Sequence, residues 1–206
     1  MKKTLIALII LTLSLGVVGC TSDKEETTSN SNEVVAQEES KEKDKRSSDE
    51  MYELYASKVD DVEKLFEENN LNFEFKNDKN NKKYDEKVVL AYEDSSKDNL
   101  GEISVANFGL LFDEKGEILY MSSRISLNVN DDEMKTKEFK FEDTEFYKLK
   151  NILIPEVNNI DEINEKVNEG YKNLTSIKSI DIENGNIKES ILLGSDRLVY
   201  TVIINP

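Results

Sequence analysis

The side chains that could do chemistry in this sequence are its many carboxylates and one thiol, that of Cys20. The chain has no histidine, so neither a Ser/His/Asp nor a Cys/His nucleophile can be assembled. Zinc sites of the usual His/Cys type are excluded for the same reason. The phosphate-binding patterns G-x-x-x-x-G-K-[ST] and G-x-G-x-x-G are also missing. We therefore expect no cofactor and no catalytic residues of these kinds.

Carboxylates leave two other kinds of site open. A pair of acids is sufficient for glycoside hydrolysis, but most of the 43 acidic residues must be ordinary solvated surface. Calcium prefers carboxylate and amide oxygens, which one short segment concentrates. That segment lacks the D-x-[DN]-x-[DN]-G spacing, so we interpret it as a solvated loop and expect no metal. Its weak candidate ligands are Asn128, Asn130, Asp131, Asp132 and Glu133.

The residues before Cys20 have the parts of an export signal. Lys2 and Lys3 give a positive start, residues 5–15 (LIALIILTLSL) form an apolar run, and residues 16–19 are small or β-branched. The run is shorter than the about 20 apolar residues of a transmembrane helix. An ordinary secretory site would favour an A-x-A pattern, which is missing. An uncleaved anchor would not need Gly-Cys at its boundary.

Val17, Val18, Gly19 and Cys20 resemble the lipobox of bacterial lipoproteins. The resemblance covers only the N-terminal segment. It implies that a signal peptidase recognises residues 17–19 and cuts before Cys20, and that the Cys20 thiol then carries a diacylglycerol. Two acyl chains suffice for stable anchoring. The implied location is the extracytoplasmic face of the cell membrane, and the Lys/Asn/Ile/Glu-rich composition resembles lipoproteins of AT-rich Gram-positive bacteria.

The formal net charge of −16 restricts the partners of the chain. An acidic surface disfavours DNA and RNA, because phosphate binding needs basic residues. It also disfavours docking on anionic lipid headgroups, so membrane contact should run through the lipid on Cys20 alone. We divide the chain into a signal peptide (residues 1–19), a lipidated cysteine with a charged linker (residues 20–50) and one globular domain (residues 51–206). The linker has too few apolar residues to fold and would act as a spacer.

Residues 51–66 carry apolar side chains at helical spacing and should form an amphipathic helix with Ser48 or Asp49 as its N-cap. Two further helices are expected, one capped by Asp143 and one opened by a capping box of Asn159 and Glu162. Alternation and turn residues predict strands elsewhere. The expected strands are residues 71–76, 87–92, 102–112, 117–129, 135–141, 176–183, 187–193 and 197–204.

Particular features refine these strands. We expect a hairpin loop at residues 113–116, a β-bulge near residues 105–106 and a tight turn at Asn184-Gly185. The lysine-rich residues 135–141 are interpreted as an edge strand. Residues 197–204 are apolar on both faces and should form a central strand.

These elements predict an α+β fold, with an antiparallel meandering sheet of about six to eight strands packed against an N-terminal helix and a central helix pair. Both halves follow a helix-then-strands plan, although no residue-level repeat supports a duplication. The missing catalytic patterns favour a non-catalytic binding, accessory or regulatory domain for a protein, peptide or cell-wall ligand. The alternative is a carboxylate-dependent enzyme that acts on cell-wall glycan or peptide.

Overall fold

The structure is a computed structural model, and it describes residues 45–77, 87–94, 96 and 99–206. All of them belong to the unit Glu42–Pro206. The expected signal peptide, the lipobox and most of the expected linker lie outside the described residues.

Helix α1 spans Ser48–Glu68 and confirms the predicted N-terminal helix. Its N-cap is Ser47, next to the expected position, and Ser47 and Glu50 form a capping box that satisfies exposed backbone N–H groups. One face is buried, as the helical spacing indicated. The helix ends at Glu68 with Asn69 as its C-cap, and Asn70 then adopts a positive φ of 55°, which asparagine tolerates better than most residues.

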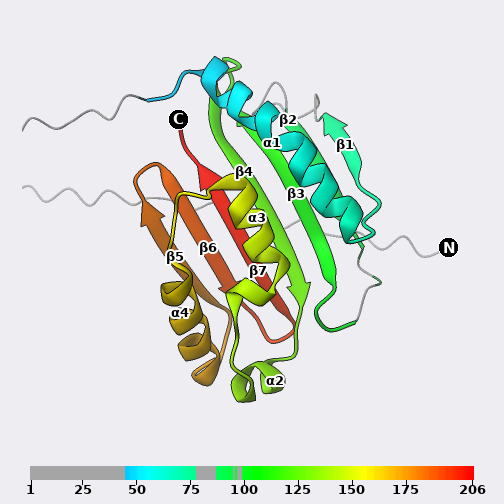
Figure 1. Cartoon of the computed structure of the whole chain (residues 1–206), viewed down its shortest axis with the longest axis vertical. Helices are drawn as coiled ribbons and strands as arrows, with labels where there is room; N and C mark the ends of the chain where they lie inside the picture. Colours follow the sequence, from blue (N-terminus) through cyan, green and yellow to red (C-terminus); the bar gives the residue numbers. More distant parts are fainter. Residues whose placement is uncertain (1–44, 78–86, 95, 97–98) are drawn as a thin grey trace, which may run out of the picture. The chain divides into compact units, whose positions relative to one another are not determined.

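Seven strands form one antiparallel sheet in the order β1-β2-β3-β4-β7-β6-β5 (Figure 1). The predicted α+β class with an antiparallel meandering sheet is therefore confirmed. The strand β7 lies between β4 and β6, which confirms the central position expected from its apolar residues. The strands are β1 (Glu74–Asn77), β2 (Lys87–Glu93), β3 (Ile103–Phe112), β4 (Ile118–Asn128), β5 (Lys178–Asn184), β6 (Ile187–Leu193) and β7 (Arg197–Ile204).

The predicted turns and the bulge are present, although the tight turn comprises Gly185 and Asn186 because Asn184 belongs to β5. Gly185 has φ 65° between β5 and β6, and Gly116 has φ 82° between β3 and β4. Glycine adopts these left-handed conformations without a steric cost. The register of β3 against β4 shifts between Ile103 and Val105, where the apolar phase of the sequence slips.

The prediction of an edge strand at residues 135–141 is wrong. Helix α2 spans Asp131–Thr136, and the 3₁₀ turn η1 spans Phe141–Asp143. Between them the chain is held by asparagine side chains instead of a neighbouring strand. Asn168 accepts a hydrogen bond from the Phe139 amide and donates one back to its carbonyl, and Asn164 accepts from the Phe141 amide. These side chains satisfy the backbone groups that a β-ladder would otherwise have to satisfy.

Helices α3 (Glu145–Leu153) and α4 (Ile160–Lys172) form the predicted central pair. Thr144, not Asp143, is the N-cap residue of α3. Asn159 stands at the N-cap of α4, but its side chain makes no capping hydrogen bond, so the predicted capping box is wrong. Its amide donates instead to Glu189 in the sheet, 2.6 Å away.

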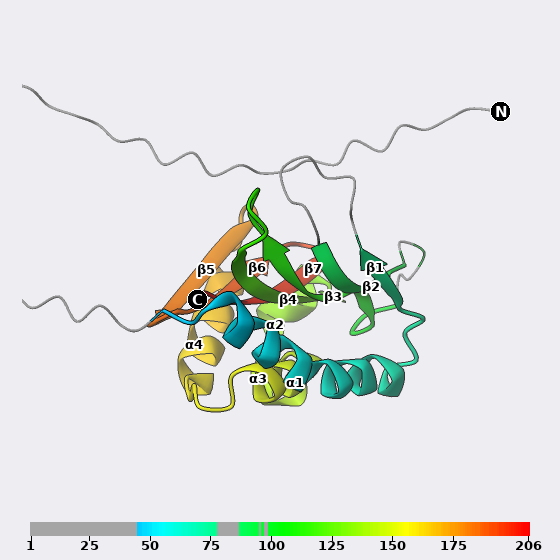
Figure 2. The same ribbon diagram turned by 90° about the horizontal axis from the view of Figure 1, so that it is seen from above.

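Helices α1, α3 and α4 lie on one face of the sheet (Figure 2). The main hydrophobic core fills the space between the two layers, and it includes Phe66, Phe108, Phe146 and Tyr200. No helix among the described residues covers the other face. We call this second surface the uncovered face.

Candidate functional site: the uncovered face of the sheet

The residues of the resembled lipobox, Val17, Val18, Gly19 and Cys20, lie outside the described residues, so lipidation stays a prediction. The acidic segment at residues 128–133 is described. Asn130 caps α2 by accepting hydrogen bonds from the amides of Asp132 and Glu133.

The remaining groups of this segment do not converge. Asn128 is nearly buried at the end of β4, and the side chain of Asp132 is 90% exposed. Asp131 pairs with Lys135 at 2.7 Å, and Glu133 pairs with Lys137. The hydrogen bond from Lys135 lowers the pKa of Asp131. Among the described residues, no group of three or more acidic side chains is arranged to hold a metal ion.

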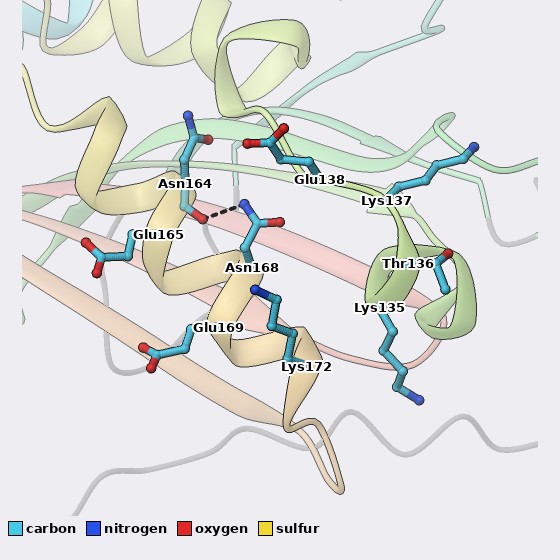
Figure 3. A pocket seen from close by; sticks show the side chains of 9 residues that line it. All are labelled: Lys135, Thr136, Lys137, Glu138, Asn164, Glu165, Asn168, Glu169 and Lys172. Atoms are coloured by element: carbon cyan, nitrogen blue, oxygen red, sulfur yellow. Dashed lines mark hydrogen bonds between the residues drawn. The ribbon is translucent and has the colours of Figure 1, made fainter.

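A groove of about 650 Å³ lies between α4 and the α2 region (Figure 3). Asn164 and Asn168 form its floor and are occupied with the backbone of the extended segment. Glu165 and Glu169 point away from α2 and Lys137 points away from α4, whereas Glu138 extends toward α4 (Figure 3). An acid pair for glycoside hydrolysis needs two carboxyl groups that face one substrate bond, about 5–10 Å apart. Glu165 and Glu169 do not face Glu138 across this groove (Figure 3).

A charged network is buried in the core between α3 and the sheet. The ammonium of Lys150 lies 2.9 Å from a carboxylate oxygen of Glu189, and both residues are 1% exposed. The Tyr200 hydroxyl and the Asn159 amide donate hydrogen bonds to the same carboxylate. Burial, and next the charge of Glu189, raise the pKa of Tyr200, so its hydroxyl keeps its proton. Such burial leaves no access for a substrate, and we interpret the network as structural.

The sequence analysis did not predict this network, although the sequence contains an indication of it. Glu189 lies in the same alternating phase as Ile187, Ile191 and Leu193, whose side chains are all buried. A carboxylate in the apolar phase of a strand indicates either a buried partner or a local change of register.

Along each strand, side chains alternate between the core and the opposite side of the sheet. Those that point away from the core form the uncovered face. One row crosses all seven strands, and its central residue is Arg124 on β4. The neighbouring row contains Val105, Ser126, Val199 and Leu192. Most residues of these two rows that lie near Arg124 have small side chains. The row through Arg124 is Glu74, Ala91, Asn107, Arg124, Thr201, Ser190 and Asp181.

Arg124 and Arg197 lie on the uncovered face, on the paired strands β4 and β7. Both are exposed. Partial desolvation is the largest effect on Arg124 and lowers its pKa. The positive charge of Arg197 lowers this pKa further, while the carboxylate of Glu93 raises it. Within the described residues, neither arginine has an ion pair, whereas lysines supply the cation of each ion pair found there.

The floor of this face is partly apolar. Leu111 and Val199 lie on it and are buried, at 9% and 4% exposed, yet they do not belong to the main core cluster. Leu192, on the same face, is 37% exposed. The surface therefore combines one exposed leucine with two arginines that form no ion pair in the described part of the chain, although the charge of Glu93 attracts Arg124.

Comparison with known protein families, with characterised proteins and with solved structures finds no match to this chain. Within the described residues, no helix combines the length and the apolar character that crossing a membrane requires.

Proposed function

We propose that the protein is a lipid-anchored lipoprotein on the extracytoplasmic face of the cell membrane, whose globular domain binds a protein, peptide or cell-wall component without catalysis. The observation that carries the binding role is the uncovered face, where Arg124 and Arg197 stand exposed beside apolar residues. An antiparallel sheet commonly has one solvated face, but such a face is usually polar. An exposed leucine, Leu192, beside two arginines that form no ion pair among the described residues suits a recognition surface.

The anchor rests on the sequence alone. Cys20 follows an apolar run and is the only thiol, and the charged linker after it would space the domain from the membrane. The domain is acidic, with exposed carboxylates along α1 and α4, so its own surface is unsuited to anionic lipids or nucleic acid.

The alternative function is a carboxylate-dependent enzyme acting on cell-wall glycan or peptide. Glu165 and Glu169 do not face Glu138 across the α2–α4 groove, and Glu189 is inaccessible, which argues against this alternative within the described residues. These two observations favour binding over hydrolysis.

Two experiments test the proposal. Cells fed a clickable fatty acid should label the wild-type chain but not Cys20→Ser, and equal membrane retention of both would leave an uncleaved anchor as the explanation. Purified protein should show no hydrolysis of cell-wall substrate, and it should retain a partner in pull-down from membranes. Robust turnover that a single Asp or Glu substitution abolishes would replace the binding role with the enzymatic one.

A further inference from the structure

We propose that the uncovered face binds an acidic peptide segment of a protein partner, with Arg124 and Arg197 each pairing with a carboxylate of that segment. The inference rests on the proposed binding function and deepens it, because it names the surface and the chemistry of the ligand.

The charge distribution within the sheet carries the argument. Strands β3, β4 and β7 contain no charged residue except Arg124 and Arg197. Charged residues make up 34% of the chain and acids outnumber bases, whereas the only two charges on these three inner strands are basic. Glu162 and Lys166 on α4 show the common pattern of an exposed pair that neutralises itself. Neither arginine forms such a pair within the described residues, so no described carboxylate neutralises them in this way.

Carboxylates lie on both sides of this basic centre. Glu93 on β2 and Asp181 and Glu183 on β5 lie toward the two edges of the same face, where Lys188 on β6 pairs with Asp181. A hydrogen bond from Ser190 lowers the pKa of Asp181, which is therefore charged at neutral pH. A broad polyanion or an anionic membrane would meet these acids as well as the arginines and be repelled. A narrow segment that places its acids at the centre would not be repelled, so the charge pattern selects an acidic peptide.

The residue type also fits a carboxylate. The guanidinium presents a planar fork that matches both oxygens of a carboxylate, whereas lysine offers a point charge. Arg46 is the one other arginine of the chain, and lysine supplies the remaining basic residues. Leu192, which is 37% exposed on the same face, would contact an apolar side chain of the same segment.

The register sets the spacing of the two contacts. Arg124 is opposite Thr201, and Arg197 is opposite Asn128, so the two arginines are four positions apart along the β4–β7 ladder. With about 3.3 Å per residue, this offset is ~13 Å between backbones. An extended peptide with two acidic residues about four positions apart would therefore reach both arginines.

The test uses residues 21–206 and a labelled peptide with two glutamates four positions apart, separated by serine, threonine and valine. Fluorescence anisotropy should show saturable binding that weakens with added NaCl, because ion pairs at an exposed surface are screened. A peptide with glutamine in place of both glutamates should not bind. We expect Arg124→Gln and Arg197→Gln each to weaken binding by about tenfold, in line with the strength of a charge-assisted hydrogen bond. Arg46→Gln is the matched control and should bind as the wild type does.

Arg124→Lys separates the fork from the charge. It should bind more weakly than the wild type, although its net charge is the same. Circular dichroism and thermal unfolding establish that the variants are folded, which we expect because both arginines are exposed.

Several results would overturn the inference. No saturable binding of the acidic peptide, or equal binding by the double glutamine variant, removes the arginines as the site. Equal arginine-dependent binding to vesicles of anionic lipid would assign the face to generic anions. Binding by residues 45–206 but not by residues 21–206 would identify the occupant as the acidic linker of the chain itself. None of these results affects fatty-acid labelling of Cys20, so failure of this inference and failure of the anchoring proposal are distinguishable.

Discussion

Replacement of Lys150 by methionine should destabilise the fold far more than the same replacement of Lys166. Both lysines lie on helices, and each has its ammonium 2.9 Å from a glutamate oxygen. They differ in burial, because the side chains of the Lys150–Glu189 pair are 2% and 1% exposed while those of the Lys166–Glu162 pair are 41% and 46% exposed. The comparison isolates burial at a constant distance and a constant substitution.

The expected magnitudes follow from what each variant leaves behind. Lys150→Met leaves the Glu189 carboxylate charged and out of water, with only Tyr200 and Asn159 as donors, and removal of one partner of a buried pair costs about 3–5 kcal/mol. Lys166→Met leaves Glu162 in water, and an exposed pair of this kind contributes about 0.3–0.5 kcal/mol.

The double variant Lys150→Met, Glu189→Gln removes both buried charges and keeps an amide oxygen that can accept from Tyr200. We expect it to be more stable than Lys150→Met alone, because the uncompensated charge is gone. Urea unfolding followed by far-UV circular dichroism measures all the variants, since the chain has no tryptophan to report by fluorescence. The reasoning is refuted if both lysine variants cost less than about 1 kcal/mol, or if the double variant is less stable than Lys150→Met.

Three further predictions follow from buried polar groups. Tyr55→Phe should leave the free energy of unfolding unchanged or raise it by up to about 1 kcal/mol, because the buried Tyr55 hydroxyl has no hydrogen-bond partner among the described residues. A loss of stability above about 1 kcal/mol in urea unfolding would show that this hydroxyl does form a hydrogen bond. Asn168→Ala should speed hydrogen exchange at the Phe139 amide and cost about 1–2 kcal/mol, and unchanged exchange would mean that another group holds the segment. Burial raises the pKa of Tyr171 and Tyr200, and of Tyr55 to about 12. The neutral hydroxyls therefore stabilise the fold fully below the unfolded pKa of about 10, and this stability falls as the pH rises above it. Absorbance at 295 nm should show these tyrosines ionising together with unfolding, and their independent ionisation near pH 10 in the folded state would contradict the burial.

Local patterns were sufficient for much of the fold. The 3.6-residue period of apolar side chains located α1. The alternation of apolar and polar residues on both sides of Asn184-Gly185 located the β5–β6 hairpin. The strand at residues 197–204 was predicted with the bounds and the central position that the structure has. The failures occurred where a side chain substitutes for backbone pairing. Nothing local to residues 135–141 reveals that Asn164 and Asn168, from a later helix, hold this segment.

The sequence by itself determined which faces of the elements are apolar, and it singled out Cys20, whose lipidation remains a prediction. It also placed Lys150 on the same helical stripe as Phe146, and Glu189 in the buried phase of β6. Only the tertiary structure decided that these two opposite charges meet, because a pairing across 39 positions depends on how α3 packs on the sheet. The proximity of the two arginines also depends on the tertiary structure. Arg124 and Arg197 are separated by much of the domain in sequence, and they share one face because β7 returns beside β4. Periodicity assigns a side chain to a face, but the strand order decides which residues stand beside it.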